Sequence, residues 1–566
     1  MAGQGGEAPG TVLDRRRDEA FPRLGGAEID RLRRFGEVRR YRDGERLFAA
    51  GEPGPGLFVV LQGTVAVTRP DGLGHAVPVV DQAEGEFLAE IGQLSGKPAF
   101  VDGHARGEVE ALLLPPEGLR AALVAEATLG ERIMRALVLR RVSLIEQGAG
   151  VLLVGSADSA DAARLSGFLT RNGQPHQLLD PGEDGDAAEL ARRYAADGAG
   201  LPLAVCGDGR VLRNPSEAEL ATCLGMVAPT ALDGRTFDVA VVGAGPAGLA
   251  TAVYAASEGL RVAVFDIRAP GGQAGASARI ENYLGFPTGI SGQALAGRAY
   301  TQALKFGAEM AIPATVARLD CAHAEQGRLR LTFCGGAVEA RTVVLAAGAR
   351  YRRLDVEGLE RFEGRGVWYW ASPIEARLAR GQEVLLVGGG NSAGQAAVFL
   401  SEHAKRVRVL VRRPLPETMS QYLVERIAAA PAIEVVEGAA VTGLAGDHGL
   451  ERVRWRGPEG EREEAIRHLF LFIGADPATG WLDGCGVALE RGFVATGADL
   501  TPERRGDHPC WRERVPAPLE TSVPGVFAVG DVRAGSVKRV GAAIGEGAAV
   551  VAQLHAHLAA RRERAG

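Results

Sequence analysis

The pattern of apolar and polar positions changes in character along the chain. Residues 21–148 show short alternating strands separated by glycine turns, and then helical periodicity from Pro116 onward. Residues 150–229 follow the order β-α-β-α-β-β-α. Beyond them, an apolar run, a glycine turn, a helical stretch and a second apolar run occur in that order twice, starting at Phe237 and at Glu383. The pattern predicts a multidomain α/β protein in which a β-roll and a small α/β domain come first.

The first of the two repeated units carries the turn Gly243-Ala-Gly245-Pro-Ala-Gly248. In this context the first glycine permits a tight turn, the second lets the backbone approach a pyrophosphate, and the third lets helix and strand pack closely. Asp266 follows the second apolar run, 23 residues after Gly243, where a carboxylate can accept ribose hydroxyls. We therefore predict a dinucleotide site in this unit.

The second unit has Gly388, Gly390 and Ala393 in the same three positions. Its second apolar run ends in Arg412, 24 residues after Gly388, so a base replaces the acid of the first unit. Because Arg412 and Arg413 can pair with a 2'-phosphate that a carboxylate would repel, this unit is predicted to prefer NADPH to NADH. The residues assigned to this site are Gly388, Gly390, Asn391, Ser392, Arg412 and Arg413.

The two units predict two Rossmann-like three-layer nucleotide-binding domains and hydride transfer between a bound flavin and a nicotinamide. The second turn also matches the G-x-S-x-G nucleophile elbow of hydrolases, from Gly390 to Gly394. A hydrolase needs a downstream acid and a histidine, and nothing in the sequence nominates them. We treat that match as accidental.

Composition and charge exclude several classes of function. Lys and Arg number 64 against 70 Asp and Glu, a net charge of -6 without a basic block, so nucleic acid is not an expected partner. The amino terminus has no apolar core typical of a signal peptide, and no apolar run is long enough to span a membrane, so we expect a cytoplasmic protein. The cysteines are scattered without C-x-x-C or metal-ligand spacing, and are expected to be buried or incidental thiols with no metal site: Cys206, Cys223, Cys321, Cys334, Cys485 and Cys510.

Four segments resemble bacterial-type thioredoxin reductases, in order and over residues 235–560. They are Gly271–Leu295, Val343–Gly358, Leu469–Pro477 and Thr521–Gly547. The resemblance implies an FAD domain formed by residues 235–350 and 474–560, an inserted NADPH domain at 351–473, and a homodimer. Carried over by position, it implies flavin nucleotide contacts for Gly272, Gln273 and Asn282, a ribitol contact for Asp531, and a place at the flavin edge for Lys538, Arg539 and Val540.

The resemblance fails where the family carries its redox-active C-x-x-C. That motif lies just before the second glycine turn, and its cysteines would fall near Trp370 and Pro373. Thiol exchange needs an attacking thiolate and a resolving partner. Direct disulfide reduction is therefore not expected, no catalytic residue is assigned, and the electrons would leave to an unidentified acceptor. Tyr369 and Trp370 either line the pocket of that acceptor or pack in the core.

Residues 150–229 resemble a glutaredoxin- or thioredoxin-like domain, with Pro202 in the place of that fold's cis-proline. The catalytic C-x-x-C of such a domain would fall in the first strand-to-helix turn, Gly155 to Ser159, which contains no cysteine. We interpret this domain as a docking or spacer module.

Residues 21–148 resemble a cyclic-nucleotide-binding domain and follow a leader, residues 1–20, that is expected to be flexible. Gly51–Val67 matches the strand and turn signature, and Phe87–Leu94 occupies the phosphate-binding segment, where Glu90 keeps the ribose carboxylate. Phe100 stands where the family has its phosphate-binding arginine, and Lys97 offers only a point charge in its place.

Two hypotheses of function follow. The first is an NADPH-dependent FAD oxidoreductase of the thioredoxin reductase-like family, with amino-terminal modules that locate or regulate it. The second is a sensor, in which a nucleotide-like ligand at the amino-terminal domain, or the flavin redox state, alters a protein contact. The fingerprints with opposite charge at the ribose position support the first, and the missing cysteines motivate the second.

Overall fold

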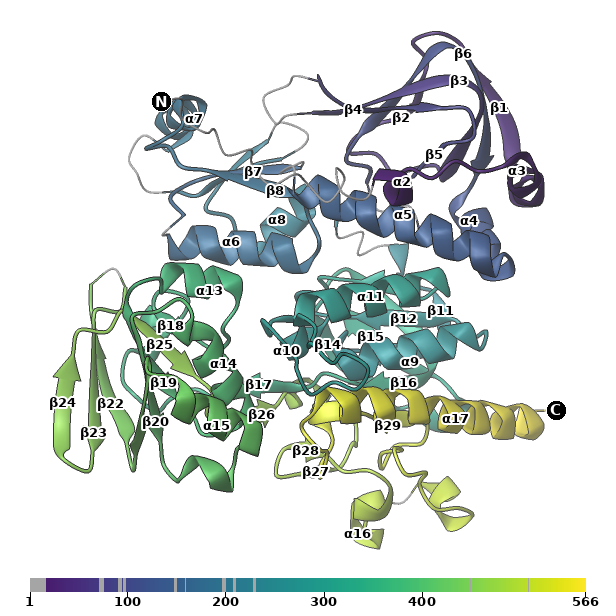
Figure 1. Cartoon of the computed structure of the whole chain (residues 1–566). Coiled ribbons are helices and arrows are strands. Elements are labelled where there is room, and N and C mark those ends of the chain that lie inside the picture. The colour runs from purple at the N-terminus through teal and green to yellow at the C-terminus, as the bar shows by residue number, and fades with distance from the viewer. Residues whose placement is uncertain are drawn as a thin grey trace, which may run out of the picture. The chain divides into compact units, whose positions relative to one another are not determined.

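The computed structural model describes residues 17–70, 76–89, 94, 98–146, 150–157, 159–195, 200–206, 210–226, 231–447, 449–506 and 508–565. Figure 1 labels most of its helices and strands. Two compact units emerge: Met1–Ala157 with Phe168–Ala228 and Thr301–Pro313, and Asp158–Gly167 with Pro229–Tyr300 and Ala314–Gly566. Among the described residues, no helix is long and apolar enough to cross a membrane.

The first unit contains the β-roll predicted from the alternating pattern. Its strands are β1 (Glu37–Tyr41), β2 (Arg46–Phe48), β3 (Leu57–Pro70), β4 (Ala76–Ala83), β5 (Phe87–Leu88) and β6 (Asp102–Leu114). They follow the order β1-β6-β3-β4, with β2 beside β6 and β5 beside β3, and all these pairs are antiparallel. Inward-facing side chains such as Phe58, Val60 and Leu113 form the core.

Helices accompany the roll on both sides of its sequence. They are α2 (Arg17–Ala20), α3 (Gly26–Leu32), the short 3-10 helix η1 (Arg33–Phe35), α4 (Pro116–Ala125) and α5 (Ala127–Glu146). The helical periodicity predicted from Pro116 onward is confirmed as the pair α4 and α5. The helix α2 lies within the span predicted to be a leader, and its last residue, Ala20, is buried.

The same unit contains a small mixed sheet. Its strands are β7 (Val151–Val154), β8 (His176–Leu179), β9 (Leu203–Val205) and β10 (Val211–Arg213), and the helices in this part of the sequence are α6 (Ala160–Arg171), α7 (Gly185–Tyr194) and α8 (Glu217–Cys223). The strand order is β10-β9-β7-β8, with β7 parallel to β8 and the other pairs antiparallel. The predicted order β-α-β-α-β-β-α is confirmed. The Leu201–Pro202 peptide bond is cis, as predicted for Pro202.

The expectation of incidental thiols is wrong for one pair of cysteines. Cys206 and Cys223 are joined by a disulfide, with their Cα atoms 6.2 Å apart and a sequence separation of 17. Cys206 follows β9, and Cys223 ends α8, so the hairpin and the helix bring together two residues that no short motif connects. Free cysteines in the described residues are Cys321, Cys334, Cys485 and Cys510.

The second unit contains the first predicted nucleotide-binding fold. Its sheet includes β11 (Thr236–Val242), β12 (Val262–Phe265), β14 (Val316–Asp320), β15 (Leu329–Phe333), β16 (Gly336–Leu345) and β29 (Val526–Ala528). The order β12-β11-β16 is parallel, β15 and β14 follow antiparallel, and β29 pairs in parallel with β16. The strand β29 therefore returns to the sheet from far along the chain.

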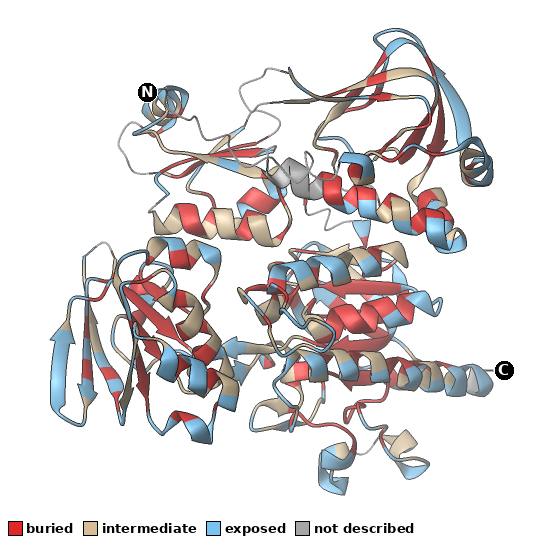
Figure 2. Cartoon of the chain, in the orientation of Figure 1, coloured by how far each residue is buried: buried red, intermediate tan, exposed pale blue. Residues whose placement is uncertain are grey.

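Helices α9 (Pro246–Ser257) and α17 (Val540–Ala565) pack closely, because a Cβ on Gly547 of α17 would collide with the Ala247 carbonyl of α9. Figure 2 colours the central strands and most of α9 as buried. Other helices of this sequence region are α10 (Gly272–Gly275), α11 (Gly292–Lys305) and α16 (Pro502–Arg505).

The second nucleotide-binding fold lies between these segments in sequence. Its strands β18 (Val367–Trp368), β25 (His468–Leu471), β19 (Glu383–Val387), β20 (Arg406–Val411) and β21 (Ile433–Glu437) form a parallel sheet in that order. The helices are α12 (Leu359–Phe362), α13 (Pro373–Leu378), α14 (Asn391–Ser401) and α15 (Gln421–Ala429). An antiparallel sheet contains β22 (Ala440–Ala445), β23 (Arg452–Gly457) and β24 (Gly460–Glu464).

Two short ribbons complete this unit. In one, β17 (Ala349–Tyr351) pairs with β26 (Ala475–Pro477), and in the other, β27 (Leu489–Glu490) pairs with β28 (Phe493–Val494). The first ribbon pairs the segment that follows β16 with the segment that follows the second nucleotide-binding fold in sequence. At this ribbon, Arg352 forms an ion pair with Asp476 at 2.7 Å. The predicted fold class, a multidomain α/β protein with Rossmann-like folds and an amino-terminal β-roll, is confirmed.

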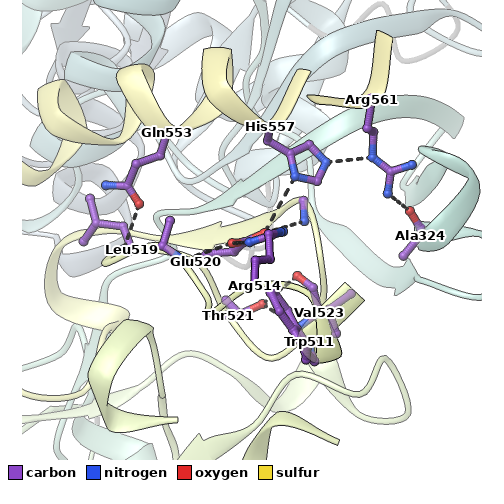
Figure 3. A network of polar contacts seen from close by, with 12 residues as sticks. Ala324, Trp511, Arg514, Leu519, Glu520, Thr521, Val523, Gln553, His557 and Arg561 are labelled. Carbon is purple, nitrogen blue, oxygen red and sulfur yellow. Dashed lines mark hydrogen bonds and ion pairs between the residues drawn. The ribbon is translucent and has the colours of Figure 1, made fainter. Parts of the chain in front are cut away.

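A buried carboxylate, Glu520, organises the carboxyl-terminal part of this unit (Figure 3). Its side chain is 1% exposed and accepts two hydrogen bonds from Arg514, at 2.6 and 2.7 Å. The Gly525 N–H also donates to it at 3.2 Å, and His557 Nδ1 lies 3.7 Å away. His557 Nε2 in turn accepts from Arg561 at 2.9 Å, so the network reaches along α17. Burial raises the pKa of Glu520, but the hydrogen bonds from Arg514 and His557 outweigh it and lower the pKa to about 2.

We expect Glu520→Gln to lower the free energy of unfolding by about 3 kcal/mol at pH 7, because it leaves the Arg514 guanidinium without its counter-charge. The wild-type contribution is present above the ordinary pKa of 4.5 and is lost as the pH falls toward 2. Urea unfolding at pH 7 and at pH 3 measures both effects. Glu357→Gln, the same change at an exposed position, is the control. Equal stability of the two variants at pH 7 would contradict this account.

Candidate functional site

The first glycine turn leaves one open position between two crowded ones. Gly243 has φ +109°, and a Cβ there would collide with the Ala346 carbonyl. A Cβ on Gly248 would collide with the carbonyl of Gly243, which fixes how closely α9 approaches the turn. A Cβ on Gly245 would meet only the Cα of Gly272, at 4.0 Å. The main chain at Gly245, at the amino end of α9, is therefore the least crowded of the three glycine positions.

Asp266 lies directly after β12, where the sequence places it, and the structure shows a task that the sequence did not reveal. Its carboxylate accepts the main-chain N–H of Ala244 at 2.8 Å, and those of Arg268 and Ala269 at 2.9 and 3.2 Å. Because Ala244 belongs to the glycine turn, Asp266 holds the turn against the end of β12. The carboxylate thus fixes the shape of the turn from the position expected of a ribose acceptor.

The second glycine turn repeats this arrangement. Gly388 has φ +142°, and a Cβ there would collide with the Phe472 carbonyl, whereas a Cβ on Gly390 would meet nothing within 4 Å. Gly390 also precedes the first residue of α14. Asn391 accepts a hydrogen bond from the Ser420 N–H at 2.7 Å, so its side chain positions the loop before α15. This turn likewise offers open main chain at a helix amino terminus.

A buried alanine and an exposed hydroxyl complete the second turn. Ala393 takes the place of the third glycine and is fully buried in the core of this fold. Ser392 is exposed on the first turn of α14. Thr418, which the sequence did not nominate, donates its hydroxyl to the Gly389 carbonyl at 2.7 Å and so links the turn to the following loop.

Arg412 and Arg413 are exposed directly after β20, the position that Asp266 occupies after β12. Within the described parts of the chain, neither arginine has a hydrogen-bond or ion-pair partner. The preceding arginines of the same strand do, since Arg406 and Arg408 lie 3.7 and 3.1 Å from Glu434. Two positive charges are therefore available to a ligand at the end of this strand.

Asp531 lies in a turn that is fixed from α17. Glu546 accepts the Gly530 N–H at 2.7 Å and also pairs with Arg533 at 2.5 Å. Burial raises the pKa of Asp531, with Glu546 adding to the rise, while Lys538 opposes it. No described residue donates a hydrogen bond to the Asp531 carboxylate, and Lys538 donates to its main-chain carbonyl at 2.6 Å. Such a half-buried carboxylate suits a hydroxyl donor from a ligand.

The other residues implied by the resemblance are placed less uniformly. Gly272, with φ +52°, approaches Gly245, and a Cβ on Gly272 would lie 3.1 Å from the Gly245 Cα. Gln273 donates to the Ala349 carbonyl. Asn282 is exposed, and no described contact ties it to the turn. Arg539 is exposed and Val540 begins α17, both shortly after Asp531.

The segment at the expected position of the missing thiols has all its aromatic polar groups satisfied. Trp368 is buried, whereas Tyr369 and Trp370 are half-buried. Trp368 donates to His468 Nδ1 at 3.1 Å, and Tyr369 donates to Glu363 Oε1. Trp370 donates to Glu375 Oε1 at 2.9 Å. Burial, followed by the hydrogen bond to Glu363, raises the pKa of Tyr369 above its ordinary value.

The two positions expected to carry cysteines are part of the local structure. Pro373 is the first residue of α13, after the N-cap Ser372, and Glu375 completes a capping box with that serine. The Trp370 ring lies 6.4 Å from the Tyr351 ring, and the Arg268 guanidinium lies 5.3 Å above it. These contacts give Trp370 partners within the described residues, although it is half-buried and belongs to neither core cluster of this fold.

In the β-roll, Arg140 is a buried residue that the sequence did not nominate. From α5 it donates to the carbonyls of Ala20 at 2.7 Å, Phe87 at 2.8 Å and Ala89 at 3.3 Å. Arg140 therefore ties α5 to the start of the segment predicted to bind a phosphate. Glu90 and Lys97 lie outside the described residues, and Phe100 is half-buried.

Comparison with known families gives two matches. The family model described as pyridine nucleotide-disulphide oxidoreductase matches residues 237–547, and the cyclic nucleotide-binding domain model matches residues 38–126. The first match contains both glycine turns, Asp266, Arg412 and Asp531. The second contains strands β1 to β6, apart from the start of β1.

Individual relatives agree with the longer match. A thioredoxin reductase of Treponema pallidum (strain Nichols) is 34% identical over 328 residues, 57% of this chain and 96% of the relative. An alkyl hydroperoxide reductase component of Pseudomonas putida is 31% identical over 405 residues, 69% of this chain and 71% of the relative. The crystal structure of the T. acidophilum thioredoxin reductase is 30% identical, with a TM-score of 0.50, over 57% of this chain and 98% of that one.

Burial of His468 makes the stability of the second nucleotide-binding fold depend on pH. His468 is 9% exposed, and burial lowers its pKa from 6.5 to about 4. The unfolded chain therefore takes up the proton first, and we expect about 3 kcal/mol of stability to be lost as the pH falls from 6.5 to 4. Urea unfolding across this range should show a smaller loss for His468→Asn than for the wild type. His323→Asn, at an exposed position, is the control and should behave as the wild type. An unchanged pH profile for His468→Asn would contradict the assignment.

Proposed function

Because the chain belongs to the pyridine nucleotide-disulphide oxidoreductase family, we propose that it passes electrons from NADPH through FAD to an acceptor. That acceptor is not a disulfide of the flavoprotein fold. The thioredoxin reductase-like members of this family use FAD and NADPH, and this chain has two glycine turns that fit such dinucleotides. The observation that carries the proposal is the contrast at the strand ends. One turn is followed by a carboxylate and the other by two arginines that have no partner among the described residues, while Trp370 and Pro373 replace the thiols.

Residues of the first fold would hold FAD, which when bound supplies a centre that accepts two electrons. The open main chain at Gly245 would admit the pyrophosphate to the amino end of α9, where backbone N–H groups favour negative charge. Asp266 would accept ribose hydroxyls while it holds the turn, and Asp531 would accept a ribitol hydroxyl. We propose flanking positions beside the flavin for Gly272, Gln273, Asn282, Lys538, Arg539 and Val540.

Residues of the second fold would hold NADPH. The main chain at Gly388 and Gly390 would approach its pyrophosphate, with Asn391 and Ser392 on the first turn of α14. Arg412 and Arg413 would pair with the 2'-phosphate. A phosphate bound by two arginines gains charge-assisted hydrogen bonds that the free hydroxyl of NADH does not offer.

The acceptor is proposed to be a quinone, oxygen, a protein or a small molecule that reaches the flavin. Trp370 and Pro373 have structural partners of their own, so the family's thiol relay has no residues at this place in the chain. What the flavoprotein fold retains is the half-reaction between the nicotinamide and the flavin.

We also propose a homodimer, as the resemblance to thioredoxin reductases implies, and a cytoplasmic location, in keeping with the proposed reductant. The proposed domains are residues 21–148, 150–229, 235–350 with 474–560, and 351–473. The match to the cyclic nucleotide-binding domain model supports a nucleotide-like ligand for the first of them.

That match also supports the alternative function, a ligand-responsive or redox-responsive flavoprotein sensor. In such a protein the amino-terminal ligand would change a protein contact, and Arg140 would be placed to couple α5 to the ligand segment. A nucleotide-dependent change of contacts without steady turnover of NADPH would favour this alternative.

We expect Arg412→Ala combined with Arg413→Ala to reduce the preference for NADPH over NADH by about tenfold to a hundredfold, since a charge-assisted hydrogen bond is worth about 1.5–3 kcal/mol and exposure to solvent leaves the pair worth about one such bond in total. The effect should appear as weaker binding of NADPH with the binding of NADH unchanged, measured as flavin reduction at varied nicotinamide concentration. Arg380→Ala removes an exposed arginine elsewhere in the same fold and is the control. An unchanged NADPH/NADH ratio in the double variant would show that the ribose-phosphate assignment is wrong.

A further inference from the structure

The Cys206–Cys223 disulfide lies away from the turn where the resembling fold would carry its thiols. That turn, Gly155 to Ser159, contains no cysteine. Cys206 follows β9, and its N–H donates to the Arg210 carbonyl at 2.9 Å where the chain enters β10. The disulfide therefore ties the β9–β10 hairpin to the last residue of α8.

The two sulfur-bearing residues differ in their access to solvent. Cys206 is 3% exposed, whereas Cys223 is half-buried. Cys223 is also the last residue of α8, where the carbonyl end of the helix disfavours a negative charge. Burial disfavours a thiolate at Cys206 as well, so access decides which sulfur is attacked, and Cys223 is the residue that an incoming thiolate can reach.

We propose that Cys206–Cys223 is a thiol–disulfide exchange site for low-molecular-weight thiols, entered at Cys223. The thiolate of the small thiol attacks Cys223 Sγ and the Cys206–Cys223 bond breaks. A mixed disulfide forms at Cys223, while Cys206 leaves as a thiolate and takes up a proton. A second small thiol then attacks the sulfur of the first small thiol within the mixed disulfide. Cys223 leaves as a thiolate and takes up a proton. Two small thiols are oxidised to one small disulfide, and the protein gains two thiols.

Reduction would release α8 from the hairpin without breaking the sheet. The strands β9 and β7 remain paired through backbone hydrogen bonds. The helix α8 is only seven residues long, and its buried residues Leu220 and Ala221 would still pack after the covalent link to the hairpin is lost. A disulfide in a protein that draws on cytoplasmic NADPH is more often exchangeable than structural, and in this respect the inference rests on the proposed function. The disulfide itself does not depend on the flavin.

Peptide mapping of the full chain tests the proposal. The folded protein is incubated with reduced glutathione, free thiols are alkylated after acid quenching, and trypsin, which cleaves after Arg210 and Arg213, separates the two cysteines. At early time points we expect glutathione on the Cys223 peptide and alkylation of Cys206, at least about tenfold in excess over the reverse arrangement, before both cysteines become alkylated. Circular dichroism should show that the chain remains folded. Alkylation of Cys334, which is exposed, is the internal control.

The inference is overturned if the disulfide stays intact while Cys334 is fully alkylated, or if glutathione appears chiefly on Cys206. Matched variants repeat the test with oxidised glutathione: Cys206→Ser should form the mixed disulfide at Cys223, and Cys223→Ser should leave Cys206 unmodified. Equal modification in the two variants would also overturn it. Reduction of the flavin by NADPH is a separate readout, so failure of the exchange site and failure of the proposed function are distinguishable.

Discussion

The close approach of α9 to its glycine turn is the constraint on which the rest of the first nucleotide-binding fold depends. No side chain fits at Gly248, because a Cβ there would meet the Gly243 carbonyl. This contact brings the amino end of the helix to the edge of the parallel sheet, with Gly245 as the open position. Asp266 fixes the same turn from β12, and Glu546 fixes the Gly530 turn from α17. The two turns proposed to contact the flavin are thus fixed by residues of, or next to, α9, β12 and α17.

Where the two nucleotide-binding folds differ, the difference lies in charge rather than in backbone. Both have a first glycine at positive φ under a carbonyl and an open second glycine that precedes a helix. In one fold the residue after the second strand is a carboxylate that accepts a hydrogen bond from the turn, and in the other it is an arginine without a partner in the described part of the chain. The same scaffold therefore carries opposite charges at the two positions where a ribose is proposed to bind.

Local patterns in the sequence predicted the features that depend on neighbouring residues. The glycine spacing, the acid-to-base exchange and the element order of the small mixed sheet follow from short-range rules, and Pro202 was placed correctly in its cis bond. Contacts between distant positions were not predictable in this way. Trp368 and His468 are 100 residues apart, Glu546 reaches Gly530 from a different element, and Cys206 pairs with Cys223 through a hairpin and a helix. No periodicity or motif carries that information, because it arises from how the elements pack.

We infer that the chain reduces FAD with NADPH and passes the electrons on without thiols in the flavoprotein fold. The most direct measurement is the anaerobic visible spectrum of the FAD-loaded protein, treated with N-ethylmaleimide until Cys334 is modified, during addition of NADPH and then of a quinone. The account predicts that NADPH bleaches the flavin absorbance and that the quinone restores it, with the treated and untreated proteins alike. A flavin that NADPH does not bleach, or a reoxidation that is lost in proportion to thiol modification, would contradict it.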